Sequence, residues 1–303
     1  MEKSMFVRKK IILLLLVVTF FISCNNNKNL TKTSYTDSYG RKITIKKKSE
    51  KPRIISIAPS MTELFFLLDN GESLIARSNY CDYPIEARKL PSAGAIIEPN
   101  FEYIIALKPD LIVASDHFTK ESVHKFEQLN IPVYIGKQGE RLEDFYQIIE
   151  DMGKIIEKNE KAKTLINNMQ SQVADVKQRV QNQNYHPKVY YMISFGESGD
   201  YTAGKNTFIA NLIRIAGGIN VADDTSGWGY SREKLFSAQP DIILTSRTEI
   251  KEQLKKDSIY SKLLQAVHNN NVYCLEKGTI ERPSIRNIEA LLELESIFFS
   301  SKK

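Results

Sequence analysis

The stretch NEKAKTLINNMQSQVADVKQRVQN, residues 159–182, predicts one long helix that separates two similar halves of the chain. Its apolar residues recur three and four positions apart, which is the spacing of a single helical stripe: Ala162, Leu165, Ile166, Met169, Val173, Val176 and Val180. Asn159 is the expected N-cap. With a rise of 1.5 Å per residue, this helix is roughly 36 Å long. A rod of that length can hold two lobes at a fixed separation.

The chain has a similar pattern on both sides of this helix. Residues 106–115 read ALKPDLIVAS and residues 237–246 read SAQPDIILTS, and each segment is a helix end, a Pro-Asp turn and a short apolar strand. A glutamate precedes both turns at the same distance, and a helix-capping residue precedes each glutamate: Glu102 after Asn100, and Glu233 after Ser231. The shared register predicts two lobes of similar construction.

Strands alternate with helices in both halves, a pattern typical of parallel sheets with helices on both faces. We therefore expect an α/β fold of two Rossmann-like lobes with mainly parallel sheets. The lobes would span residues 35–158 and 183–303, and the rigid helix 159–182 would join them. Ligands collect beyond the carboxyl ends of parallel strands. If the lobes face each other, these ends line one ligand cleft between them.

The first residues are read as a targeting segment rather than as part of the fold. Residues 1–23 combine a basic start with an apolar run too short to span a membrane comfortably, as in a signal peptide. Ser23 followed by Cys24 is similar to a bacterial lipoprotein processing site, which predicts that Cys24 carries the lipid. An ordinary signal peptide with an incidental cysteine is the alternative. Residues 24–34 are polar and are expected to be a tether between membrane and domain.

Composition narrows the classes of partner. The formal net charge of +6 falls to +3 without residues 1–23, and no basic tract with interleaved aromatic residues is present. Nucleic acid is therefore not an expected partner. After processing, only Cys81 and Cys274 remain, one in each predicted lobe. A disulfide would require them to meet across the lobes, so two free thiols are expected in a protein that we take to be a monomer.

The sequence offers little catalytic or metal-binding machinery. Its four histidines are scattered, and no paired cysteines or compact carboxylate set accompany them, so we expect no metal site held by the protein. Residues 199–207, GDYTAGKNT, match a phosphate loop up to Lys205, but Asn206 stands where Ser or Thr would hold magnesium. A nucleotide-dependent enzyme is an alternative, and a turn at a helix N-terminus is preferred.

Aromatic residues cluster in the segments expected at the cleft. Trp228, the only tryptophan, lies between two glycines, and further aromatic residues follow other strands: Tyr80, Phe195, Tyr201 and Tyr230. Together they favour a flat, largely apolar ligand with a polar rim, which Arg282 could anchor. Ser60 and Glu63 have the spacing of a capping box, so Glu63 is expected to be structural.

Glu102 and Glu233 occupy matching places in the two halves. Each stands in the first turn of a predicted helix, where the dipole favours an anion. Matching positions on two lobes also place two carboxylates on one face. A symmetric partner that carries arginines could then engage both carboxylates.

Several motifs carry a resemblance to a known family. They include residues 54–64, IISIAPSMTEL, the loop 80–84, YCDYP, and the matched units 100–111 and 231–241, together with Phe195-Gly196 and residues 203–205, AGK. From about Pro52 to the end, the chain resembles the helical-backbone class of substrate-binding proteins of ABC importers. That class carries siderophores, haem and cobalamin, and the likeness is strongest to its cobalamin-binding members.

The resemblance implies a non-enzymatic receptor outside the cytoplasm, in the periplasm or on the outer leaflet of the membrane. It implies that Tyr80, Phe195, Trp228 and Arg282 contact a cobalamin-like corrinoid or another metal chelate, which is cargo and not a catalytic cofactor. It also implies that Glu102 and Glu233 dock onto arginines of a permease dimer that works with ATPase subunits. A ferric-siderophore or haem receptor is the alternative within the class, since Ile96, Ile97 and Gly278 replace residues of the cobalamin-binding members. An adhesive surface lipoprotein is a further alternative.

Overall fold

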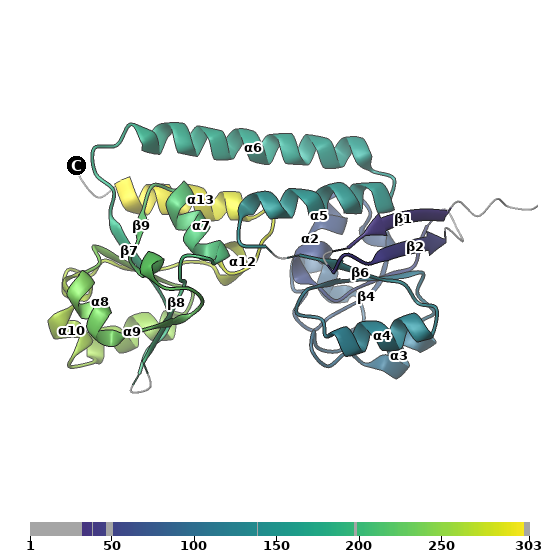
Figure 1. Ribbon diagram of the computed structural model, residues 1–303, viewed down its shortest axis with the longest axis horizontal. Coiled ribbons are helices and arrows are strands. Elements are labelled where there is room, and N and C mark those ends of the chain that lie inside the picture. Colours follow the sequence, from purple (N-terminus) through teal and green to yellow (C-terminus); the bar gives the residue numbers. More distant parts are fainter. Residues whose placement is uncertain (1–31, 38, 47–50, 138, 197–198, 300–303) are drawn as a thin grey trace, which may run out of the picture.

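The structure is a computed structural model that describes residues 32–37, 39–46, 51–137, 139–196 and 199–299. Helix α6 (Asn159–Gln181) runs along one side of the molecule. Beneath it lies a layer that contains α5 (Leu142–Ile155), α7 (Phe208–Ile215) and α13 (Asn287–Phe299), and two lobes extend from this layer away from α6 (Figure 1). The predicted signal peptide and Cys24 lie outside the described residues. In the described part of the chain, no helix has the length and apolar character needed to cross a membrane.

The N-terminal lobe is built on a four-stranded parallel sheet with the order β4 (Leu74–Arg77), β3 (Ile54–Ser56), β5 (Leu111–Ser115) and β6 (Val133–Gly136). Its strands are almost wholly buried, because helices cover both faces. These helices include α2 (Pro59–Leu67), α3 (Phe101–Ala106) and α4 (Lys120–Gln128). The antiparallel hairpin of β1 (Lys32–Thr36) and β2 (Lys42–Lys46) precedes the sheet, so β1 begins inside the range assigned to a tether.

The C-terminal lobe repeats this order and adds to it. Strands β9 (Ile219–Asn220), β7 (Lys188–Ser194), β11 (Ile242–Thr245) and β12 (Val272–Cys274) are parallel. Two antiparallel strands, β8 (Asp200–Thr202) and β10 (Gly229–Tyr230), extend the sheet beside the carboxyl end of β7. Between α7 and α13 the lobe also contains five shorter helices: α8 (Arg232–Ala238), α9 (Thr248–Lys256), α10 (Tyr260–Leu263), α11 (Gln265–His268) and α12 (Lys277–Ile280). The predicted two-lobed α/β fold is therefore confirmed.

The two Pro-Asp turns perform the same structural task in the two lobes. The Asp110 side chain accepts a hydrogen bond from the amide of Arg53 at 3.0 Å, and the Asp241 side chain accepts one from Lys188 at 2.7 Å. Each aspartate thereby ties the start of its strand to the start of the neighbouring parallel strand. The residue before each proline is left-handed, with φ of 48° at Lys108 and 45° at Gln239. The sequence repeat is thus also a repeat of backbone geometry.

Helix α6 binds the two lobes into one core. Most of its apolar stripe is buried, with Leu165 and Ile166 partly buried, and one hydrophobic cluster contains Ala162, Met169 and Val173 together with residues from both sheets. Arg179 of α6 forms a two-point ion pair with Glu295 of α13, at 2.6 and 2.7 Å. The N-cap is Lys158 and not Asn159, which is already helical. A continuous core on a straight helix favours small movements between the lobes.

Candidate functional site

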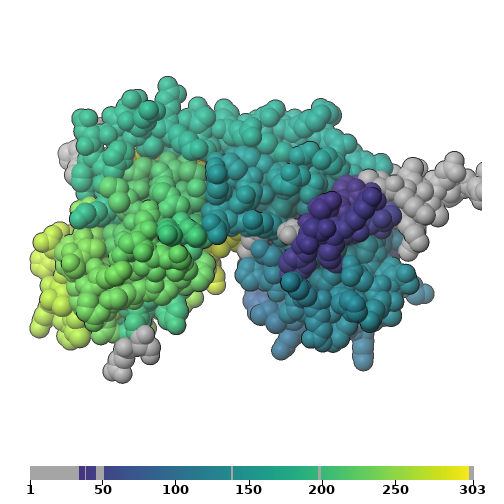
Figure 2. Space-filling view, in the orientation of Figure 1, coloured from purple at the N-terminus to yellow at the C-terminus, as the bar shows by residue number. Residues whose placement is uncertain are grey.

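The carboxyl ends of the two parallel sheets face each other across a hollow between the lobes. Figure 2 shows this hollow on the side of the molecule away from α6, and Figure 1 shows α12 between the lobes. Arg282 follows α12 in the C-terminal lobe. It contacts Glu63 of α2, the helix after β3, and Asp82 of the loop after β4. Segments that follow strands in both lobes therefore meet at one place.

Arg282 is the charged centre of the region where the two lobes meet. Its Nη2 lies 3.3 Å from Oε1 of Glu63 and 3.2 Å from Oδ1 of Asp82, and it donates a hydrogen bond to Asp82. The contact with Glu63 is an ion pair without hydrogen-bond geometry, and both Glu63 oxygens lack a hydrogen-bond partner among the described residues. The structure thus brings the predicted rim residue Arg282 to the cleft, already held by two carboxylates.

Burial shapes the electrostatics of Glu63. The residue is only 2% exposed, and burial raises its pKa to about 7, although Arg282 and Arg286 oppose the shift. A carboxyl group in so little water favours its neutral form unless donors replace the lost hydration. Glu63 is therefore poised to gain or lose a proton near neutral pH.

A second contact across the cleft lies beside the first. The guanidinium of Arg286, just before α13, stacks on the ring of Tyr83 at 4.3 Å from its centroid, and its Nη2 binds Oε2 of Glu276 at 2.9 Å. Gly278 lies beneath both arginines, because a Cβ there would be 2.8 Å from Nη2 of Arg282 and 3.0 Å from Nη1 of Arg286. The absence of a side chain at this position lets the two guanidinium groups approach the α12 backbone.

Large aromatic side chains remain open to solvent in the segments expected at the cleft, among them Tyr83, which is 44% exposed beside Arg286. Tyr80 is 58% exposed, Tyr201 51% and Trp228 48%. Tyr201 on β8 pairs with Gly229 on β10, so Trp228 lies next to Tyr201 in the hairpin-like extension of the C-terminal sheet. The backbone oxygen of Trp228 accepts a hydrogen bond from the amide of Thr202 at 2.7 Å, which fixes its backbone. Exposed aromatic faces held on fixed backbone are typical of a binding surface.

Two other aromatic residues pack against side chains inside the C-terminal lobe. Tyr230, expected at the cleft, is buried: its ring lies 5.7 Å from Tyr190, and its hydroxyl donates to the oxygen of Val221 at 3.2 Å. Phe195 is partly buried and packs on Tyr260 at 4.8 Å between ring centroids. Trp228 lies in the bend before β10 and Tyr230 lies within that strand, so the spacing of the two residues did not predict that only Tyr230 would be buried.

The phosphate-loop match at residues 199–207 is a turn against the neighbouring loop. The amides of Gly204 and Lys205 donate to the oxygens of Gly227 and Thr225 at 2.9 and 2.8 Å. The side chain of Thr207 caps α7 by accepting from the amide of Ala210. Because these backbone amides are used inside the protein, they do not form a cradle for phosphates.

The expected capping box at Ser60 and Glu63 is wrong. Helix α2 begins at Pro59, its N-cap is Ala58, and no side chain makes the cap hydrogen bond. Pro59 supplies the start of the helix instead, since proline lacks an amide proton and has a helical φ. One signal in the sequence pointed to Glu63 as a cleft residue. It is the only charged residue of α2, a helix that is buried from Pro59 to Phe65.

Glu102 and Glu233 both lie exposed in the first turn of their helices, α3 and α8. The predicted caps are confirmed, since Asn100 accepts from the amide of Tyr103 at 3.0 Å and Ser231 from that of Lys234 at 3.3 Å. The Ser231 hydroxyl donates to Glu233 at 2.6 Å and lowers the pKa of that carboxyl. Helices α3 and α8 lie in different lobes, both in the parts remote from α6 (Figure 1).

The remaining sulfur and metal-ligand chemistry is sparse. Among the described residues, Cys81 is a buried free thiol and Cys274 a partly buried one, and burial raises the pKa of each. In the same part of the chain, no three His, Cys, Asp or Glu residues are grouped to hold a metal ion. The site offers aromatic surface and paired charges instead.

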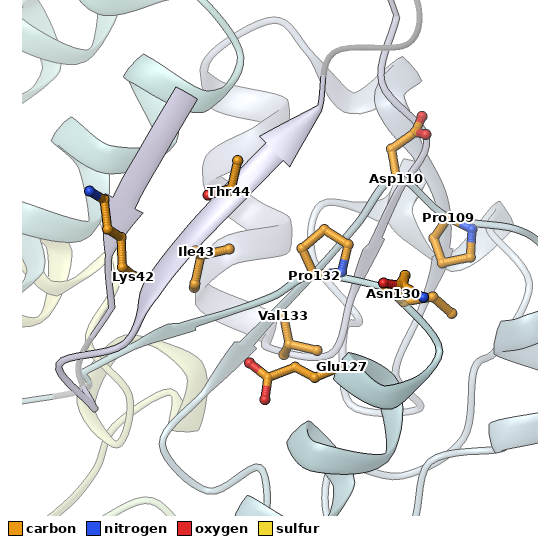
Figure 3. A pocket seen from close by; sticks show the side chains of 10 residues that line it. Lys42, Ile43, Thr44, Pro109, Asp110, Glu127, Asn130, Pro132 and Val133 are labelled. Atoms are coloured by element: carbon orange, nitrogen blue, oxygen red, sulfur yellow. The ribbon is translucent and has the colours of Figure 1, made fainter. Parts of the chain in front are cut away.

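Two concave surfaces lie at the opposite ends of the strands. One, of about 300 Å³, borders the start of β5 and β6 and includes Pro109, Asp110 and Pro132 (Figure 3). The other, of about 280 Å³, borders the starts of β11 and β12 and includes Pro240 and Asp241. They are repeated features of the Pro-Asp turns, away from the carboxyl ends where Arg282 lies.

Comparisons with known proteins agree with this geometry. The chain matches a family model described as "periplasmic binding protein" over residues 54–278. It is 29% identical over 258 residues to the vitamin B12-binding protein of Vibrio parahaemolyticus, covering 83% of this chain and 90% of that protein. It is 28% identical over 269 residues to the high-affinity heme uptake system protein IsdE of Staphylococcus aureus, covering 84% and 91%.

Among solved structures, the vitamin B12 binding protein BtuF of Vibrio cholerae has a TM-score of 0.70 at 26% identity. The match covers 81% of this chain and 96% of that one. These similar proteins are transport binding proteins and not enzymes, as expected for this chain.

Proposed function

Because this chain belongs to the periplasmic binding protein family, we propose that it captures a cobalamin-like corrinoid and delivers it to the permease dimer of an ABC importer. The chain is a substrate-binding protein of the class whose members carry cobalamin, haem or siderophores.

The observation that carries the proposal is the exposed aromatic surface in the segments that follow the strands of both lobes. Tyr80 belongs to the N-terminal lobe, and Tyr201 and Trp228 belong to the C-terminal one. Aromatic faces supply large apolar contact areas at little cost in side-chain entropy, and they suit a flat macrocycle. Arg282 and Arg286 lie between the lobes, where polar substituents on the rim of such a ligand could bind.

The cargo would bring its own metal. Among the described residues, no three His, Cys, Asp or Glu are grouped to hold a metal ion by themselves, so aromatic packing and hydrogen bonding would supply most of the recognition of a corrinoid. The partly buried Phe195 could contact the edge of the ligand while its other face stays packed on Tyr260.

The test is a titration of the purified protein with cyanocobalamin, haemin and ferric siderophores. Trp228 is the only tryptophan, so quenching of its fluorescence reports on this site alone. We expect saturable quenching at micromolar or lower cyanocobalamin, confirmed by calorimetry to exclude light absorption by the ligand. Quenching by haemin or a siderophore but not by cyanocobalamin would replace the corrinoid with that ligand.

One observation favours haem as the second candidate. His117 follows β5 at the carboxyl edge of the N-terminal sheet, its side chain is 65% exposed, and its Nδ1 lies 3.5 Å from Oδ1 of Asp116. A carboxylate next to one imidazole nitrogen leaves the other nitrogen free to bind iron. If haem is the cargo, haemin should give a shifted Soret band that is lost in His117→Ala and kept in His268→Ala, a control on α11.

Delivery is proposed to use the two matched carboxylates. Glu102 and Glu233 are exposed and lie at equivalent positions of the two lobes, each in the first turn of its helix. A permease dimer with an arginine on each subunit would match both. Cys24 is proposed to hold the protein at the membrane through its lipid, in the periplasm or on the outer leaflet.

A further inference from the structure

Glu63 is a buried carboxylate of the cleft without a hydrogen bond in the described part of the chain. It is 2% exposed, and neither of its oxygens has a hydrogen-bond partner in the described part of the chain, although Arg282 stands 3.3 Å away. A buried charge in this state destabilises the folded protein. The expected structural role, a helix cap, is absent. Glu63 therefore requires another explanation, and its partner Arg282 suggests one.

Glu63 and Asp82 together neutralise the guanidinium of Arg282. The two acceptors differ in access: the Glu63 side chain is 1% exposed and that of Asp82 is 56% exposed. A ligand group can replace Asp82 at the open side of the guanidinium, but it cannot displace Glu63 without opening the lobe. When it is ionised, Glu63 is thus a fixed counter-charge, whereas Asp82 is an exchangeable one.

The charged groups around Arg286 do not give the cleft a net positive charge. Arg286 is paired with Glu276 at 2.9 Å and stacked on Tyr83. With all groups ionised, the two arginines face four carboxylates: those of Glu63, Asp82, Glu276 and Glu289, the last at 3.8 Å from Nε of Arg286. A carboxylate on the ligand would enter a cluster without surplus positive charge, whereas a neutral amide would meet no charge repulsion.

We propose that Glu63 is a positioning residue that selects the charge of the ligand: it holds and neutralises Arg282, so the cleft accepts a neutral amide carbonyl on the ligand rim in preference to a carboxylate. This inference rests on the proposed function and refines it, because it concerns the peripheral substituents of the macrocycle. The ligand carbonyl accepts a hydrogen bond from Arg282 in place of Asp82. Glu63 acts through Arg282 and need not touch the ligand.

The experiment compares ligands that differ only in this substituent. Dissociation constants are measured at pH 8 for cyanocobalamin and for its monocarboxylic acids, in which one peripheral amide is hydrolysed. Haemin and its dimethyl ester form a second matched pair. The proteins are the wild type, Glu63→Gln, Asp82→Asn and, as control, Asp151→Asn, which removes a different buried carboxylate bonded to Tyr134 at 2.6 Å. Thermal melts establish that each variant is folded.

We expect the wild type to prefer the neutral member of the pair it binds. Glu63→Gln should shift this preference towards the carboxylate by about tenfold, Asp82→Asn should shift it in the same direction, and Asp151→Asn should leave it unchanged. If Glu63→Gln does not fold, the ligand preference of Asp82→Asn, a variant at an exposed position, tests the inference instead. A preference unchanged in the folded variants overturns the inference and leaves the proposed function intact. A wild type that binds neither macrocycle overturns both.

Discussion

The backbone amide of Leu142 donates a hydrogen bond to the side-chain oxygen of Asn211 at 3.0 Å. Leu142 is the first residue of α5, and Asn211 lies in α7 of the other lobe. An orphan amide at a helix start is thus satisfied from across the molecule. The bond lies in the layer under α6, where the hydrophobic core of both lobes is continuous. The lobes are therefore joined by packing and by specific polar contacts as well as by the covalent chain.

The first prediction concerns this contact. Asn211→Leu should lower the free energy of unfolding by about 1 to 2 kcal/mol, because it leaves the Leu142 amide without its acceptor. Asn211→Asp is the matched control, since it keeps an acceptor and adds a charge favourable at a helix N-terminus. Urea unfolding followed by circular dichroism measures both. Equal stability of the wild type and Asn211→Leu would contradict the structural importance of the bond.

The second prediction separates binding from folding at Trp228. Since this side chain is 48% exposed, Trp228→Ala should change the free energy of unfolding by less than about 0.5 kcal/mol. Ligand affinity, measured by calorimetry, should fall by about tenfold or more because an aromatic contact is lost. Leu263→Ala, at a similarly exposed position on α10, should alter neither quantity. Unchanged affinity in Trp228→Ala would remove Trp228 from the site.

The third prediction concerns delivery. Glu102→Arg and Glu233→Arg should each reduce uptake in cells strongly, and the double variant should abolish it, because like charges would face the permease. Ligand affinity of the purified variants should stay within about twofold of the wild type. Glu121→Arg in α4 and Glu249→Arg in α9 are matched controls, since both residues are exposed in first turns. Normal uptake by the double variant would rule out the docking role.

The fourth prediction follows from the pKa of Glu63, which burial raises from its ordinary 4.5 to about 7. Between these values the folded protein keeps a proton that the unfolded chain has released, so the contribution of Glu63 to stability is complete below pH 4.5. It is lost as pH rises through 7. Around the carboxyl group stand Arg282 and Arg286, which lower its pKa, and Asp82 and Glu276, which raise it.

Glu63→Gln has no such titration. Relative to the wild type, the ligand-free variant should therefore gain on the order of 2 kcal/mol of unfolding free energy between pH 5 and pH 8. Taking the difference between the two proteins cancels the titration of the histidines. If the unfolding free energies of the two proteins change in parallel between pH 5 and pH 8, Glu63 does not titrate in this pH range.

The fifth prediction concerns the membrane anchor. Cys24→Ser should move the protein from the membrane fraction to the soluble fraction of its host, because the thiol that would carry the lipid is removed. Metabolic labelling with a radioactive fatty acid should mark the wild type and spare the variant. Cys274→Ser is the control, since Cys274 lies within the folded C-terminal lobe. Labelling of Cys24→Ser would place the lipid on another residue.

Local patterns predicted the elements well because each depends on neighbours in the sequence. Most of the apolar stripe from Ala162 to Val180 is buried along α6, and the caps Asn100 and Ser231 bond as their spacing predicted. The matched Pro-Asp turns also have matched hydrogen bonds. The same logic failed at Glu63, since capping-box spacing does not reveal that Pro59 starts the helix.

The cleft could be predicted only in part. Tyr80 and Trp228 are exposed as a ligand surface requires, but Tyr230 is buried, because its ring packs beside Tyr190 in a contact that only the tertiary structure creates. The antiparallel pair β8 and β10 gave no pattern long enough to recognise, because two or three residues cannot show a period of two.

The sequence by itself determined the helix between two repeated α/β lobes, the family, and the matched glutamates, because hydrophobic periodicity and turn chemistry are written along the chain. Only the tertiary structure decided that Arg282 stands between Glu63 and Asp82, residues some two hundred positions away in the chain. Burial and charge pairing at that distance depend on how the lobes pack, and no local pattern encodes them.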